Sequence, residues 1–226
     1  MVTVYIVPNW FHGYDVSFEI MFAVITLLVS LFSFKIFKLS EQKESKYFAV
    51  GFLLISLSYF VWAFLNLRLV SELKEGVRVL ELKNLLIFST VSIYVYMILA
   101  LVGIIVIAYT TLKINNEIAF LLIVIPSIAT LFLSNNKTLA FGILSSIMLL
   151  FIFVHFYLEF RKDNNLKRGL VMVAFLLLFI GNIEFSFVQN SYVHYVVRHI
   201  LDLAAYVLVL ISLIWVIKNG QKKKQT

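Results

Sequence analysis

Long apolar runs recur along the chain, and they constrain its fold more than any other feature. Charge-poor stretches of about 20 residues, the helix length that crosses a bilayer core of about 30 Å, occur seven times. They cover residues 16–37, 47–67, 84–112, 118–134, 138–158, 169–188 and 196–217. Short connections require successive helices to be antiparallel neighbours. The sequence therefore predicts an all-α integral membrane protein, a seven-transmembrane-helix bundle.

Composition agrees with this class and sets the domain boundaries. With 62% hydrophobic and 14% charged residues, a chain of 226 residues leaves little for any part outside a membrane. We expect one transmembrane domain over residues 16–218, followed by a basic cytoplasmic tail over 219–226. Residues 1–15 have neither a basic segment nor a cleavage site typical of a signal peptide. We expect them to lie at the outer membrane surface, anchored by Trp10, Phe11 and Tyr14.

Lys and Arg residues are distributed unequally between the two sets of alternate loops, which predicts the orientation. One side carries thirteen: Lys35, Lys38, Lys43, Lys46, Lys113, Arg161, Lys162, Lys167, Arg168, Lys218, Lys222, Lys223 and Lys224. The other side carries six: Arg68, Lys74, Arg78, Lys83, Lys137 and Arg198. The N-terminus is therefore predicted outside and the C-terminus in the cytoplasm, as in a multi-pass plasma-membrane protein. The loop around residues 71–83 forms either a solvated cap or a short interfacial helix.

Several classes of function lack the residues they need. The net charge is +7, but the basic residues lie between apolar runs and at the C-terminus, where they would meet lipid headgroups. No nucleic-acid partner is therefore expected. The chain has no Cys and four His, and it lacks HExxH, Gly-rich phosphate and nucleophile-elbow motifs. Although His199, Asp202 and Glu184 could supply three zinc ligands, no paired-His motif accompanies them. We therefore expect no metal and no enzymatic activity.

Ionisable residues near the outer ends of three spans are the strongest candidates for a site. Counting about 20 residues from the cytoplasmic ends places Asp202 and Glu184 each about 6 Å inside the outer boundary. Glu19 lies at the same rim of the first span. Arg198 is four residues from Asp202 and could pair with it or reach Glu184. An outward-facing polar pocket between helices 6, 7 and 1 would bring these groups together.

Helical spacing adds further candidates to this pocket. His199, Asp202 and Tyr206 share one face of the last helix, and Tyr59, Trp62 and Asn66 share one face of the second. Either Tyr94 or Tyr96 could join them from the third. The alternative is that Arg198 and Asp202 only neutralise each other near the headgroups, and that the aromatic residues are interfacial belt residues. We predict ligand binding by Glu19, Glu184, Arg198, His199, Asp202, Tyr206, Trp62 and Asn66.

The segment Leu201–Tyr206, LDLAAY, resembles part of the last helix of microbial rhodopsins. In that family a Leu-Asp pair precedes the retinal-binding lysine, which follows the Asp by four residues. The likeness extends to seven helices, an outer N-terminus, tight loops and a similar length, and it implies an opsin-like bundle. However, Tyr206 occupies the lysine position, so no Schiff base can form there. We therefore expect no covalent retinal and no other cofactor.

These features together predict a sensory or receptor-like binding module. A small ligand would enter from the outer side, and a cytoplasmic or membrane protein partner, or a second copy of the chain, would receive the signal. Lys43, Arg161, Arg168 and the Lys222–Lys224 tail would contact such a partner. A small transporter, or the membrane subunit of a larger complex, is the alternative. A structural bundle without any ligand would require the acidic residues to be rim groups only.

Overall fold

The computed structural model describes residues 13–75, 79–114, 116–187 and 192–222, and within them the chain forms seven α-helices and no strand. The helices are α1 (Tyr14–Ser40), α2 (Lys43–Glu75), α3 (Val79–Thr111), α4 (Glu117–Leu133), α5 (Lys137–Asp163), α6 (Leu166–Ser186) and α7 (Tyr192–Lys222). The all-α class is confirmed. Residues 1–12, with the predicted anchors Trp10 and Phe11, and the tail from Lys223 onward lie outside the described residues.

Six of the seven helices contain a segment long and apolar enough to cross a membrane, which indicates a multi-pass membrane protein. Large apolar side chains cover their outer surfaces, such as Phe64 and Leu31, which are more than half exposed. In a bilayer these side chains contact lipid. The exception is α4, which is apolar but has only 17 residues.

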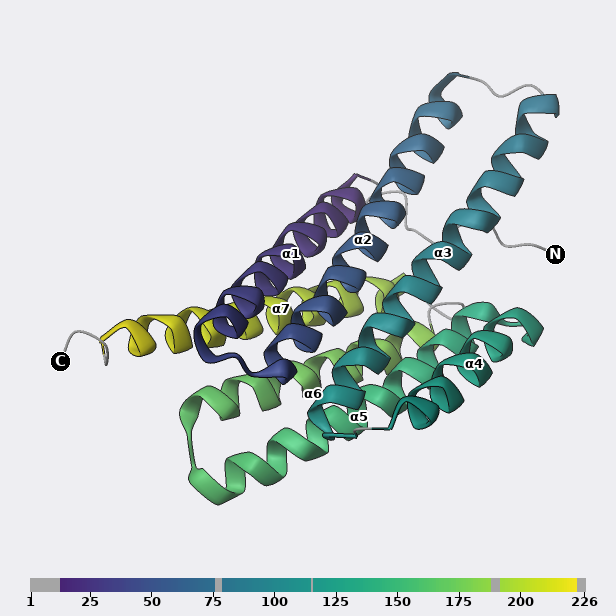
Figure 1. Ribbon diagram of the computed structural model, residues 1–226. Helices are drawn as coiled ribbons and strands as arrows, with labels where there is room; N and C mark the ends of the chain where they lie inside the picture. The colour runs from purple at the N-terminus through teal and green to yellow at the C-terminus, as the bar shows by residue number, and fades with distance from the viewer. Residues whose placement is uncertain (1–12, 76–78, 115, 188–191, 223–226) are drawn as a thin grey trace.

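The helices form a ring of two layers, with α1, α2 and α3 packed side by side over α7, α6 and α5 (Figure 1). Contacts between α1 and α7 and between α3 and α5 close the ring at its two edges. Helix α4 lies outside this ring, against α3 and α5. The interior is therefore enclosed by six helices, and α4 connects the two layers.

Asparagine side chains begin three of the helices after very short connections. The Asn116 side chain accepts hydrogen bonds from the backbone of Ile118 and Ala119, and Asn136 and Asn165 cap α5 and α6 in the same way. An Asn cap satisfies an amide that the first helical turn leaves without a partner. These caps explain how connections of two to five residues suffice to reverse the chain, as predicted from the short loops.

The predicted loop at residues 71–83 is mostly helical in the structure. Helix α2 continues to Glu75 and α3 begins at Val79, so the two helices extend together beyond the rest of the bundle (Figure 1). The described residues therefore contain no separate interfacial helix, because the residues predicted to form it belong to the ends of α2 and α3. Below this extension α2 and α3 pack closely at Gly51 and Gly103. A Cβ on either glycine would lie within 3 Å of the other's carbonyl oxygen.

Candidate functional site

A cluster of buried polar side chains lies inside the ring, towards the end at which α1 begins. We call the two ends of the bundle the Tyr14 end and the Ser40 end, after the first and last residues of α1. The cluster draws its residues from α1, α2, α3 and α7, and we call it the polar centre. It comprises Glu19, Tyr59, Asn66, Tyr96, Arg198, His199, Asp202 and Tyr206, all of them buried.

Arg198 is the cation of this polar centre, and three different groups contact its guanidinium. Its Nε donates to Asp202 Oδ2 at 3.3 Å, and one terminal nitrogen donates to the Tyr96 hydroxyl at 2.9 Å. The Phe185 ring of α6 stacks against it, with 3.7 Å between the guanidinium carbon and the ring centroid. The predicted pairing of Arg198 with Asp202 is thus present, and the pair is only 6% and 2% exposed. A solvated rim pair would be much more exposed.

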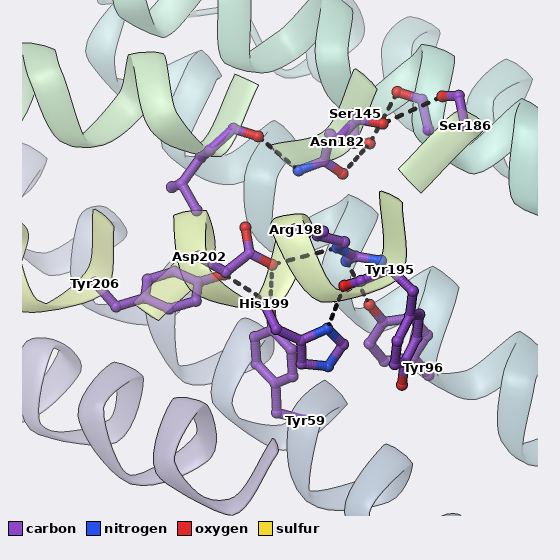
Figure 2. A network of polar contacts seen from close by, with 12 residues as sticks. Tyr59, Tyr96, Ser145, Asn182, Ser186, Tyr195, Arg198, His199, Asp202 and Tyr206 are labelled. Carbon is purple, nitrogen blue, oxygen red and sulfur yellow. Dashed lines mark hydrogen bonds and ion pairs between the residues drawn. The ribbon is translucent and has the colours of Figure 1, made fainter. Parts of the chain in front are cut away.

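Asp202 also connects α7 to α2 through tyrosine hydroxyls, as Figure 2 shows. Tyr59 donates to Asp202 Oδ2 at 3.3 Å and shares a hydrogen bond of 3.0 Å with the Tyr206 hydroxyl. The second carboxylate oxygen, Oδ1, accepts no hydrogen bond from any residue that the structure describes. It faces α6 at Gly181, where an added Cβ would lie 3.0 Å away. A glycine at this position leaves room for the carboxylate between the two helices.

His199 lies beside this network among aromatic rings. Its Nδ1 donates to the backbone carbonyl of Tyr195 at 2.8 Å, one turn earlier in α7. The imidazole ring contacts the rings of Phe18, Phe22 and Tyr195, with centroids 4.4–5.9 Å apart. These contacts fix the orientation of the ring on the face of α7 that looks towards α1.

Glu19 and Asn66 form a second buried pair in the polar centre, between α1 and α2. The Asn66 side-chain amide donates to Glu19 Oε1 at 2.6 Å, and both residues are fully buried. Together with Phe22, Tyr59, Trp62, Tyr96, Phe185, Tyr195, Arg198, His199 and Asp202, Glu19 lines a cavity of about 10 Å³. This volume is close to the space that one water molecule needs.

Of the eight predicted ligand-binding residues, the structure brings seven together and places Glu184 elsewhere. Glu184 pairs with His194 across the Tyr14 ends of α6 and α7, and both side chains are partly exposed. Helix α6 instead borders the polar centre through Phe185 and Gly181. The difference arises because Glu184 and Phe185 are successive residues on a helix and point about 100° apart.

The sequence analysis missed a second buried polar contact, between α5 and α6. Asn182 accepts a hydrogen bond from Ser145 at 2.8 Å and donates to the carbonyl of Leu178 at 3.0 Å (Figure 2). An amide inside the otherwise apolar run of α6 is the signal that could have revealed it.

Two further cavities continue from the polar centre towards the Ser40 end. A cavity of about 20 Å³ is lined by residues of five helices, among them Phe52, Asn182 and Tyr206. A larger cavity of about 310 Å³ lies at the Ser40 end, where Phe48, Lys113, His155 and Glu159 are among the lining residues. The ring is thus closely packed around its ionic residues and more open at the opposite end.

Comparisons with known proteins identify no relative of this chain. The chain matches no family model, no curated protein and no solved structure. The resemblance of LDLAAY to microbial rhodopsins therefore has no support beyond the seven-helix layout. Within the described residues, no group of three or more His, Asp or Glu side chains is arranged to hold a metal ion.

Proposed function

We propose that the protein crosses the plasma membrane seven times, with the Tyr14 end outside and the Ser40 end in the cytoplasm. The unequal distribution of Lys and Arg between the two ends supports this orientation. Helix α4 supplies the seventh crossing, because its length of 17 mostly apolar residues is at the short end of the range that spans a bilayer. Its apolar exposed side chains, such as Leu122 at 68%, would then contact lipid.

We propose further that the protein is a receptor-like module that binds a small ligand at the polar centre, where the side chains must move apart to admit it because the cavity holds about one water molecule. The observation that carries this proposal is the buried network of Arg198 with Asp202, Tyr59 and Tyr96. Placing ionisable groups inside a membrane costs free energy. The attraction within a buried ion pair seldom offsets the free energy lost when its two groups are desolvated. A network of this kind is therefore better explained by binding than by stability.

The route of the signal follows from the helices that share the network. Tyr59 joins α2 to α7, and Arg198 joins α7 to α3 and α6. A ligand that binds more tightly to one arrangement of these helices shifts the population towards it. A cytoplasmic partner would detect this shift at the basic Ser40 end, through Lys43, Arg161, Arg168 or the Lys222–Lys224 tail.

A small transporter is the second candidate, and the row of cavities favours it. Along α2, Tyr59, Phe52 and Phe48 line the three cavities in succession, so the cavities follow one another along the bundle. Transport would require the aromatic residues between them to move apart. A receptor needs no such movement.

The test begins with native purification and mass spectrometry of the small molecules that remain bound. The identified compound is then applied to purified protein in nanodiscs, and its binding is measured by thermal shift. Asp202→Asn should abolish this shift, whereas the matched variant Glu117→Gln, an exposed acid on α4, should retain it. An equal shift in both variants would contradict binding at the polar centre.

Liposomes separate the two candidates. If the protein is a receptor, the same compound will bind from the outer side, yet it will not accumulate in liposomes that contain the purified chain. Sustained uptake that Asp202→Asn abolishes would instead establish the transporter.

A further inference from the structure

The Glu19–Asn66 pair has two oxygen atoms that lack a donor. Glu19 Oε2 and Asn66 Oδ1 are both buried, and neither accepts a hydrogen bond from any residue in the described part of the chain. The Trp62 indole acts on the same carboxyl group as a weak hydrogen-bond donor, but no hydrogen bond of normal geometry reaches Oε2. An acceptor buried without a donor costs about 1–3 kcal/mol, and more if it is charged. Two such acceptors on adjacent side chains therefore indicate a missing positive or hydrogen-bond-donating group.

The charges around Glu19 also favour a positive group beside it. Asp15 lies one helical turn away, is also buried, and acts on Glu19 as a like charge. Arg198 attracts Glu19 only from a distance, because its own hydrogen bonds go to Asp202 and Tyr96. These buried side chains thus hold three carboxyl groups and one guanidinium, and that guanidinium forms its ion pair with Asp202 rather than with Glu19.

We propose that Glu19 and Asn66 bind a single monovalent cation no larger than a water molecule: sodium, potassium or ammonium. Carboxylate and amide oxygens are the ligands that hard cations prefer. The cavity that Glu19 lines has a volume of about 10 Å³, so it excludes any larger organic cation, and Asn66 adjoins it through its hydrogen bond to Glu19. The rings of Phe22, Tyr59, Trp62 and Tyr96 also line the cavity and can contribute cation–π attraction, and Arg198, which lines it too, is neutralised by its pairing with Asp202.

A divalent ion fits these residues less well. Calcium takes six to eight oxygen ligands with several carboxylates, and magnesium retains a shell of water. Neither the volume nor the number of acidic groups at Glu19 provides for this, since no three metal-binding side chains converge within the described residues. This inference rests on the proposed function in one respect: the cation would be part of the ligand-binding site and would set the charge of that site.

The experiment measures thermal unfolding of the purified protein in nanodiscs, without any organic ligand. Sodium, potassium, lithium and ammonium chloride are titrated against N-methylglucamine chloride at constant ionic strength, because N-methylglucamine is too large for the cavity. We expect at least one small cation to raise Tm saturably, by roughly 5 °C or more at saturation. General screening would affect all the salts alike and would not saturate.

Variants assign the effect to the pair. Glu19→Gln removes the charge and keeps the shape of the side chain, so the apparent affinity for the cation should fall at least about tenfold, and Asn66→Leu should weaken it further. Glu117→Gln is the matched control and should behave like the unaltered chain. Should the variants fail to fold, the selectivity and saturation measured on the unaltered protein still decide the question.

Two results would overturn the proposal. One is a Tm that is the same in all chlorides, including N-methylglucamine; the other is a saturable effect that Glu19→Gln leaves unchanged. Either result leaves the proposed receptor function intact if the co-purified compound still binds through Asp202. Conversely, a cation effect in a protein that binds no compound would refute the receptor function and retain the cation site.

Discussion

Replacing Asp202 by Asn removes one charge from the polar centre while keeping the size of the side chain. Asn can still accept from Tyr59 and from Arg198, so both hydrogen bonds can persist in a weaker form. What is lost is the carboxylate that neutralises the Arg198 guanidinium, which is only 6% exposed. The substitution therefore measures the cost of leaving a buried cation without its counterion.

The expected magnitude follows from the contacts of Asp202. Hydrogen bonds inside membrane proteins contribute on average about 0.6 kcal/mol each, so the two weakened bonds account for about 1 kcal/mol. Breaking a buried ion pair by removing one partner costs about 3–5 kcal/mol in total, and the remainder comes from the charge on Arg198. For a chain of this size the loss corresponds to a Tm decrease of roughly 10 °C.

An apolar variant shows whether the network is kept for stability. Arg198→Met and Asp202→Leu remove both charges together, and Tyr96→Phe removes the hydroxyl that would otherwise lose its donor. Replacing a buried ion pair by apolar residues of similar volume is often neutral or stabilising by about 1–4 kcal/mol. We expect the triple variant to unfold at or above the Tm of the unaltered protein and to have lost ligand binding.

The assay is thermal unfolding in nanodiscs, followed by far-ultraviolet circular dichroism and by the fluorescence of the three Trp residues. Ligand binding is measured on the same samples. A triple variant less stable than Asp202→Asn alone would refute the reasoning, since the network would then hold the helices together in its own right.

Three further predictions follow from the same structure. If the Tyr14 end is outside, an impermeant thiol reagent on intact cells will label Ser71→Cys and will not label Ser40→Cys; the reverse pattern would invert the orientation. Gly181→Ala places a Cβ 3.0 Å from Asp202 Oδ1 and should destabilise the protein by about 1–3 kcal/mol in chemical unfolding; a neutral result would show that α6 moves freely. Because Glu184 pairs with His194, its replacement by Gln and Asp202→Asn should be additive within about 0.5 kcal/mol in a double-mutant cycle.

Much of the fold was predictable because lipid imposes a simple rule on the backbone. Every amide inside a membrane needs an internal partner, so each long apolar run must be helical, and short loops fix the neighbours. The predicted spans agree with the helices to within a few residues at the ends of α1 and α4. The extensions of α2 and α3 were missed because charged residues end an apolar run without ending a helix, so hydropathy says nothing of that boundary.

The site was predictable to the extent that helical spacing and depth determine it. Spacing placed His199, Asp202 and Tyr206 on one face, and the structure directs that face into the ring. The rotation of one helix against another does not follow from spacing, and for this reason Phe185 rather than Glu184 faces Arg198. Likewise, the position of α4 outside the ring cannot be derived from its sequence, which is apolar on all sides.

The position of Asp202 explains how a small occupant of the polar centre could influence the whole bundle. Its Oδ2 is bonded to α2 through Tyr59, whereas its Oδ1 rests against the backbone of α6 at Gly181. A ligand that displaces this carboxylate would change its contact with α6 or its hydrogen bond to α2. The helices of the two layers pack directly against each other at the α1–α7 and α3–α5 edges and are joined between them by the side chains of the polar centre, so a displacement of α7 changes the α1–α7 edge directly. Binding at one carboxylate would therefore alter the packing of α7 against both layers, and a change of helix packing at one site is how receptors and transporters convert binding into a wider rearrangement.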